Sequence, residues 1–147
     1  MASDNIVSTN VELATFYVGE ALCGIDILNI QEINKQIEVT VVPQSSDFVT
    51  GVLNLRGRIV TVVDLGKKLG LSSIEMSKDN RNIIVDSKDE QIGLLVDRIS
   101  DVLIAKSSQI EPAPANIGNI QGKFFKGVYK TDNSLIGILN IDEVLND

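Results

Sequence analysis

The residue types that most often carry catalysis are scarce in this chain. It contains no histidine, which removes the commonest general base and the usual partner of a serine or cysteine nucleophile. Its single cysteine, Cys23, stands in an apolar stretch, so we expect a buried and inert thiol. Asp26 and Glu32 are the best candidates for a catalytic carboxylate pair, but their positions fit a turn and a strand edge better. The sequence therefore argues against an enzyme, and we expect no metal or other cofactor.

An arginine at a turn is the clearest candidate for binding. Two apolar, β-branched runs, 52–55 and 59–63, flank Arg56 and its neighbours and predict a hairpin whose strands are buried on both faces. No acidic residue nearby in the sequence pairs with Arg56, so we expect its side chain to be free to face a partner. A planar guanidinium can donate several hydrogen bonds to carbonyls or carboxylates. After the hairpin, Asp64 is expected to cap one short helical turn.

Composition restricts the function further. The chain has 147 residues, of which 44% are hydrophobic and 4% aromatic, so we expect a β-protein with an aliphatic core. The net charge of −7 argues against a nucleic-acid partner, because phosphates repel such a surface. No apolar run is long enough to span a membrane, and the first residues lack the features of a signal peptide. We expect a cytoplasmic protein with no direct membrane insertion.

The chain repeats itself. Residues 14–43 match residues 83–112 at an offset of 69, as in the pair Gly24 and Gly93. Beyond the prolines the offset becomes 76, as in the pair Gly51 and Gly127, because the second half carries seven extra residues in a segment of loop composition. Each half therefore has the same succession of strands, ending in a hairpin and a short helical turn.

The repeat predicts five short strands per half. A sheet this small closes its edges best by curling into a barrel. We expect an all-β fold of two five-stranded barrels side by side, over approximately 12–71 and 82–147, joined by the polar stretch 72–81. One nine- or ten-stranded sandwich is the alternative. The expected strands are 12–18, 22–27, 30–42 with a break near 35–36, and the central hairpin, followed by 82–87, 91–96, 99–105, 127–130 and 135–140.

Several short motifs, in order along the chain, resemble the CheW family of bacterial chemotaxis coupling proteins. This resemblance implies one CheW-like domain over 1–147 made of two SH3-like barrels. It also implies a non-catalytic adaptor that couples the cytoplasmic tips of transmembrane chemoreceptors to the regulatory domain of the histidine kinase CheA. The matching motifs are Gly51–Gly57, Ile59-Val60 and Val63–Leu65, with Gly24–Ile27, Gln31–Ile33, Val42-Pro43, Val96-Asp97 and Asp101–Leu103.

The resemblance also assigns binding residues. The residues implied to bind the receptor are Ile30, Glu32, Gly51, Arg56 and Val102. Those implied to bind the kinase are Val39, Thr40 and Gly127. For Gly127 we expect a partner backbone to lie against the position, so that any side chain there would push the partner away.

Two other functions are compatible with the residues. One is a CheW-like adaptor of another two-component pathway, such as surface motility, which the sequence does not separate from chemotaxis. The other is a small ligand-binding β-barrel or enzyme that uses Asp/Glu pairs or a bound metal. A metal analysis and a nucleotide-binding screen would distinguish this second class from an adaptor.

Overall fold

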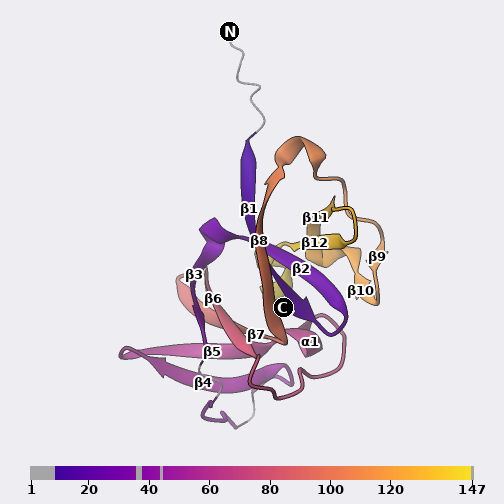
Figure 1. Ribbon diagram of the computed structural model, residues 1–147. Helices are drawn as coiled ribbons and strands as arrows, with labels where there is room; N and C mark the ends of the chain where they lie inside the picture. The colour runs from indigo at the N-terminus through magenta and orange to yellow at the C-terminus, as the bar shows by residue number, and fades with distance from the viewer. Residues whose placement is uncertain (1–8, 36–37, 44, 147) are drawn as a thin grey trace.

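Two five-stranded sheets make up the fold of the computed structural model, which describes residues 9–35, 38–43 and 45–146 (Figure 1). The first sheet has the strand order β11-β12-β2-β1-β8, and the second has the order β3-β6-β7-β5-β4. The strands of the first sheet are β1 (Asn10–Val18), β2 (Ala21–Asp26), β8 (Arg98–Lys106), β11 (Phe125–Lys130) and β12 (Leu135–Leu139). Those of the second are β3 (Ile30–Asn34), β4 (Val49–Leu55), β5 (Arg58–Asp64), β6 (Arg81–Ser87) and β7 (Glu90–Val96).

Each sheet takes strands from both halves of the chain. Strands β1 and β2 of the first half pair with β8 and β12 of the second, while β6 and β7 pair with β3 and β5. The predicted division into one barrel over 12–71 and another over 82–147 is therefore wrong. A repeat determines which strands correspond, but it does not determine which of two equivalent hairpins a strand will pair with. The all-β class and the two five-stranded units are confirmed.

The repeat itself is visible in the register of the strands. Replacing each strand by its counterpart, β1 by β6, β2 by β7, β3 by β8, β4 by β11 and β5 by β12, converts one sheet order into the other. The parallel pairs correspond as well, since Val62 lies opposite Gly93 and Ile138 opposite Gly24. One main apolar cluster contains residues of both sheets, among them Phe16 and Leu94, which are fully buried. Neither half could bury this core alone.

Short helical turns follow both central hairpins, as predicted. Helix α1 (Leu65–Lys68) follows β5, and α2 (Ile141–Leu145) follows β12. The segment after α1 is tied back to the fold, because the Asp64 carboxylate accepts hydrogen bonds from the backbone N–H groups of Lys67 and Ile74. The remaining elements are the 3₁₀ turns η2 (Ile27–Asn29), η3 (Ser107–Gln109) and η4 (Gly122–Phe124) and the small hairpin of β9 (Asn116–Ile117) and β10 (Ile120–Gln121).

The predicted strand ends agree with the structure within about two residues except in three places. Strand β4 begins at Val49, three residues before the predicted start at residue 52. The third strand, expected over 30–42, ends at Asn34, and Thr40 then forms an isolated bridge to Val52; residues 36–37 of that prediction lie outside the described residues. The insertion near Asn116 was expected to be loop but contains β9 and β10. In the described part of the chain, no helix is long and apolar enough to cross a membrane.

Candidate functional site

Arg56 lies at the tip of the β4–β5 hairpin in a strained turn. Leu55 pairs with Arg58, so the turn itself consists of Arg56 and Gly57, whose φ angles are 53° and 83°. Two positive φ values are typical of the type I′ turn, whose twist matches that of the flanking strands. This turn favours asparagine or glycine at its two central positions. The Asn54 side chain stabilises it by accepting the Gly57 N–H at 2.9 Å. Lys88 and Asp89 in the β6–β7 turn also have positive φ, so Arg56 is distinguished by what its side chain contacts and not by its backbone conformation alone.

Arg56 is not free, contrary to the prediction. Its guanidinium donates to the carboxylate of Glu32 in β3, forming an ion pair whose two side chains are 74% and 26% exposed. Glu32 also accepts a hydrogen bond from the Asn34 amide at 3.3 Å. These two donors, Arg56 first, lower the pKa of Glu32 below its ordinary value. The structure thus brings together two residues that the sequence assigned separately to receptor binding.

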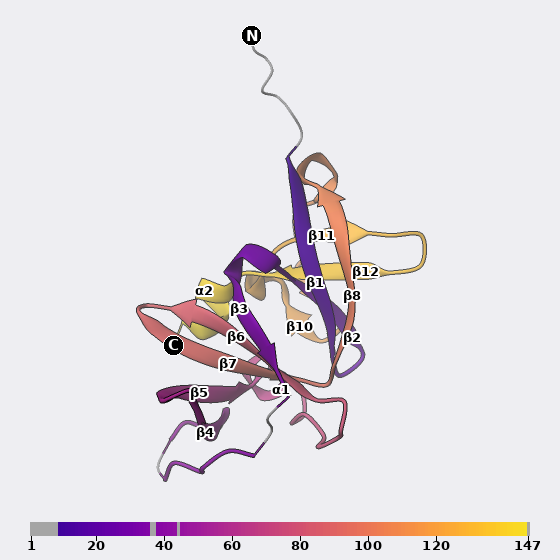
Figure 2. The ribbon, with the colours of Figure 1, turned by 60° about the vertical axis from the view of Figure 1, so that its left-hand side comes forward.

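This ion pair also joins the two edges of the second sheet. Strand β3 is one edge of that sheet and β4 is the other, with three strands between them. Figure 2 shows β3 running down toward the β4–β5 hairpin as the sheet curls. The Arg56–Glu32 contact therefore lies where a partner could reach both edges of the curled sheet together.

Gly51, Val39 and Thr40 form a second cluster in the same sheet. Thr40 and Val52 exchange backbone hydrogen bonds of 2.9 and 2.8 Å, which lays the segment around Thr40 along β4. A Cβ on Gly51 would come within 2.4 Å of the Thr40 carbonyl oxygen and 3.0 Å of the Val39 side chain, and the φ of Gly51 is 153°. Gly51, which the resemblance assigned to receptor binding, therefore lies against Val39 and Thr40, which it assigned to kinase binding. Gly51 is buried, Val39 is half-buried against the core, and Thr40 is the exposed member.

Gly127 occupies the corresponding position in the first sheet. Glu111 and Val128 exchange backbone hydrogen bonds of 2.9 and 2.8 Å. A Cβ on Gly127 would lie 2.7 Å from the Glu111 carbonyl oxygen and 2.8 Å from the Ile110 side chain. The expectation that a partner backbone lies against Gly127 is wrong, because the neighbouring backbone belongs to the chain itself. The two kinase assignments lie on different sheets, because Gly127 is in β11 of the first sheet and Thr40 bridges to Val52 in β4 of the second.

The other two predicted receptor residues differ in exposure. Ile30 begins β3 and is half-buried against the core, so it supports the strand that carries Glu32. Val102 in β8 is 58% exposed, and Ile104, two residues further along, is 59% exposed. Residues two apart in a strand share one face. The first sheet thus has an apolar pair at the edge strand β8, of which the sequence identified one member.

Sequence reasoning also missed an exposed isoleucine near the hairpin tip. Ile59, opposite Asn54, is 65% exposed, although the run 59–63 was expected to be buried on both faces. A continuous apolar run gives no sign of which side chains face solvent, because alternation is the only sequence signal for a half-exposed strand. Ile59 provides apolar surface close to the charged pair.

Catalytic chemistry has little support in the geometry. Burial raises the pKa of the Cys23 thiol to about 12. The Asp26 carboxylate accepts the Leu28 N–H at 3.0 Å and so caps η2, while Glu32 is bonded to Arg56. Among the described residues, no group of three or more His, Cys, Asp or Glu side chains could hold a metal ion. The exposed features of the site are the Arg56–Glu32 pair and the apolar residues Ile59, Val102 and Ile104.

Comparison with known proteins identifies the family to which this fold and this site correspond. The CheW-like domain family matches residues 12–147. The chemotaxis protein CheW of Thermotoga maritima is 39% identical over 136 residues, covering 92% of this chain and 88% of the relative. CheW of Helicobacter pylori is 34% identical, with 88% and 78% of the two chains covered. The crystal structure of a scaffolding protein, CheW from Thermoanaerobacter tengcongensis, superposes with a TM-score of 0.86 at 33% identity, over 95% of this chain and 94% of that one.

Proposed function

The chain belongs to the CheW family of non-catalytic chemotaxis scaffold proteins, and from this premise we propose that it holds chemoreceptor tips and the regulatory domain of CheA in one complex. Chemotaxis adaptors of this family couple receptors to the kinase. An adaptor transmits a signal only if its contacts differ between the active and inactive arrangements of its partners. The proposal therefore needs two separate contact surfaces.

The Arg56–Glu32 pair is the observation that carries the receptor surface. Arg56 keeps an exposed side chain in a backbone conformation that disfavours it, by roughly 1 kcal/mol or more. A guanidinium has five N–H donors, so a bond to Glu32 leaves others for carbonyls or carboxylates of a receptor helix. Glu32 orients the arginine before the partner arrives, which lowers the entropy lost on binding. Exposed Ile59 and, on the first sheet, Val102 would add apolar contact.

The kinase surface is proposed around Val39 and Thr40. Thr40 is exposed beside Val41, whose side chain is 73% exposed, and Val39 fixes this segment by packing against the core. Gly127 would act indirectly, since it allows the Glu111 segment to lie along β11. In a cell the protein would be cytoplasmic and recruited to membrane receptor arrays by the receptor contact.

Replacement of Arg56 tests the receptor surface. We expect Arg56→Ala to cost roughly 1 to 3 kcal/mol of affinity for a receptor cytoplasmic-tip fragment, as for a truncated hot spot. Arg56→Lys should recover only part of this affinity, because one ammonium does not replace the guanidinium fork. Titration calorimetry measures both affinities, and thermal unfolding should show that neither variant is unfolded.

Lys88→Ala is the matched control. Lys88 is a cation with a φ of 50° in the β6–β7 turn of the same sheet. Its replacement removes the same charge from a similar hairpin tip and should leave receptor affinity unchanged. Full receptor affinity in Arg56→Ala, together with normal kinase control in a strain that lacks the adaptor, would refute the proposal. Unfolding of Arg56→Ala would show instead that the residue is structural.

A further inference from the structure

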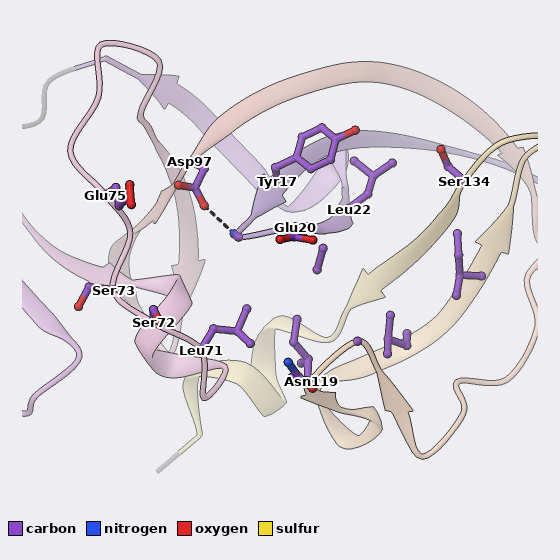
Figure 3. Close-up of a pocket in the computed structure, with 16 residues that line it drawn as sticks. Tyr17, Glu20, Leu22, Leu71, Ser72, Ser73, Glu75, Asp97, Asn119 and Ser134 are labelled. Carbon is purple, nitrogen blue, oxygen red and sulfur yellow. Dashed lines mark hydrogen bonds between the residues drawn. The ribbon is translucent and has the colours of Figure 1, made fainter.

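A cleft of about 970 Å³ lies where four segments from distant parts of the chain meet (Figure 3). Its walls are the β1–β2 turn, the segment that follows α1, the β9–β10 hairpin and the start of β12. None of the eight residues proposed above for receptor or kinase binding lines it. The cleft is therefore a separate feature of the surface.

Hydrogen bonds hold two of these walls in place. The Asp97 carboxylate accepts the Gly19 N–H at 2.6 Å, which fixes the β1–β2 turn. The Asn80 amide donates to the Asp97 carbonyl oxygen at 3.1 Å, and the Ile74 N–H donates to Asp64 at 3.1 Å. These bonds hold the segment after α1 near its middle, at Ile74, and at its end, at Asn80. The cleft is therefore formed before any ligand binds, which is typical of binding sites.

The lining combines apolar side chains with carboxylates. Aliphatic residues line the cleft, and one of them, Leu135, is 39% exposed. Glu20 from the β1–β2 turn and Glu75 from the segment after α1 add negative charge from different walls, and no lysine or arginine is among the lining residues. In Figure 3, Glu20 lies between Leu22 on one side and Leu71 and Asn119 on the other. The aliphatic residues are Ala21, Leu22, Leu71, Ile117, Ile120 and Leu135.

We propose that this cleft binds a segment of a partner protein in which lysine or arginine alternates with aliphatic residues. Such side chains have an apolar stem and a charged end, so they match a lining in which aliphatic side chains and carboxylates lie together. Negative charge on Glu20 and Glu75 attracts a cationic segment and repels an acidic one. Ser72, Ser73 and Asn119 supply polar groups for the backbone of the bound segment.

A defined peptide tests the proposal. The probe is fluorescein-labelled Gly-Leu-Lys-Leu-Lys-Leu-Gly, titrated with the full chain and followed by fluorescence polarisation. We expect saturable binding that the same peptide with glutamate in place of lysine, or serine in place of leucine, does not show. In ¹⁵N-labelled protein, the amide signals that shift should be those of the cleft, including Gly19, Ser72 and Asn119.

Two pairs of substitutions separate the cleft from general charge attraction. Glu20→Gln with Glu75→Gln should weaken peptide binding about tenfold, as the loss of two charges from the lining would. Glu12→Gln with Glu90→Gln makes the same change in net charge at exposed strand residues outside the cleft and should change binding less than about twofold. Equal losses in both pairs, binding of the glutamate peptide, or shifts away from the cleft would each overturn the proposal.

Discussion

The second hairpin of each half can be compared directly, because β4–β5–α1 and β11–β12–α2 are counterparts in the repeat. Both first strands have a bulge at a buried glycine, Gly51 or Gly127. Each glycine lets a neighbouring segment approach, through a bridge at Thr40 in one half and at Glu111 in the other. The two hairpins thus share the glycine, the bulge and the bridging segment, which are the features that the close backbone approach requires.

The two hairpins differ at their tips. The first has a two-residue turn with Arg56 bonded to Glu32. The second has the four-residue loop 131–134, where the Thr131 backbone N–H donates to the Ser134 carbonyl oxygen with an N···O distance of 2.9 Å. The Thr131 hydroxyl also accepts the Ser134 N–H at 3.0 Å, so this loop is held by contacts within itself and not by a residue of another strand. We infer that the repeat marks the structural frame and that departures from it, such as Arg56, mark function.

The largest expected effect tests the shared frame. Gly51→Ala and Gly127→Ala should each lower the free energy of unfolding by roughly 2 kcal/mol or more, because a Cβ would meet a backbone carbonyl. Gly51→Ala should lower the free energy of unfolding more than Gly127→Ala, since the φ of Gly51, 153°, is also unfavourable for a residue with a side chain. Chemical denaturation measures both.

Gly70→Ala separates strain from steric overlap in this experiment. Gly70 has a φ of 85° but nothing within 4 Å of the added Cβ. Its replacement should cost about 1 kcal/mol, from backbone strain alone. A Gly127→Ala variant as stable as the unmodified protein would mean that the Glu111 segment does not lie against β11. Gly127→Glu is unsuitable for testing kinase binding, because lost affinity would follow from unfolding.

The helix caps of the two hairpins should differ in how much they stabilise the fold. Asp64 and Asn140 are counterparts that cap α1 and α2. Asn140 accepts one N–H, from Glu143, whereas buried Asp64 accepts from both Lys67 and Ile74. Asn140→Ala should cost about 1 kcal/mol of stability, and Asp64→Ala roughly 2 to 3 kcal/mol.

The measurement is again chemical denaturation, with Asp64→Asn as the isosteric control for the Asp64→Ala variant. Asn keeps one acceptor oxygen and should recover part of the loss. Equal costs for Asp64→Ala and Asn140→Ala would show that the bond to Ile74 adds nothing, and would make the two caps alike.

Local structure was predictable from the sequence, and the pairing of distant strands was not. Apolar runs between turn residues placed β5 and β7 within about two residues, and Asp64 identified the start of α1. The exchange of hairpins between halves was missed, because the two halves have similar strands and either could supply the partner of β2. Only the packed core, which spans both sheets, decides between the two arrangements.

In the candidate site, too, the sequence predicted individual residues but not the contacts between distant ones. The sequence identified Arg56 and Glu32 one at a time, but they are 24 residues apart and on different strands, so their contact depends on the curl of the sheet. The positive φ of Arg56 could have been suspected from the two-residue turn length. Gly127 was assigned to a partner because no sequence signal shows that Glu111 lies against it.

The smallest expected effect concerns the charge of Glu32. Its pKa in the folded protein is lowered, chiefly by the hydrogen bond from Arg56. A carboxylate with a lowered pKa stabilises the fold above its unfolded pKa, and this stabilisation is lost as the pH falls through the folded value. Glu32→Gln should therefore reduce stability slightly at pH 7 and have no effect once the pH is well below about 4, where glutamate is protonated in both states.

The counterpart of Glu32 in the repeat, Asp101, supplies the control for this prediction. Asp101 is exposed in β8, and the side-chain ion pairs found among the described residues do not include it. Glu32→Gln should flatten the pH dependence of stability when it is compared with Asp101→Asn, which removes a carboxylate that is not in the Arg56 contact. A carboxyl titration by NMR gives the direct reading: the Glu32 midpoint should rise toward its ordinary value in Arg56→Ala. An unchanged midpoint would mean that Arg56 does not bond Glu32 in solution, and the two hairpin tips would then differ only in length.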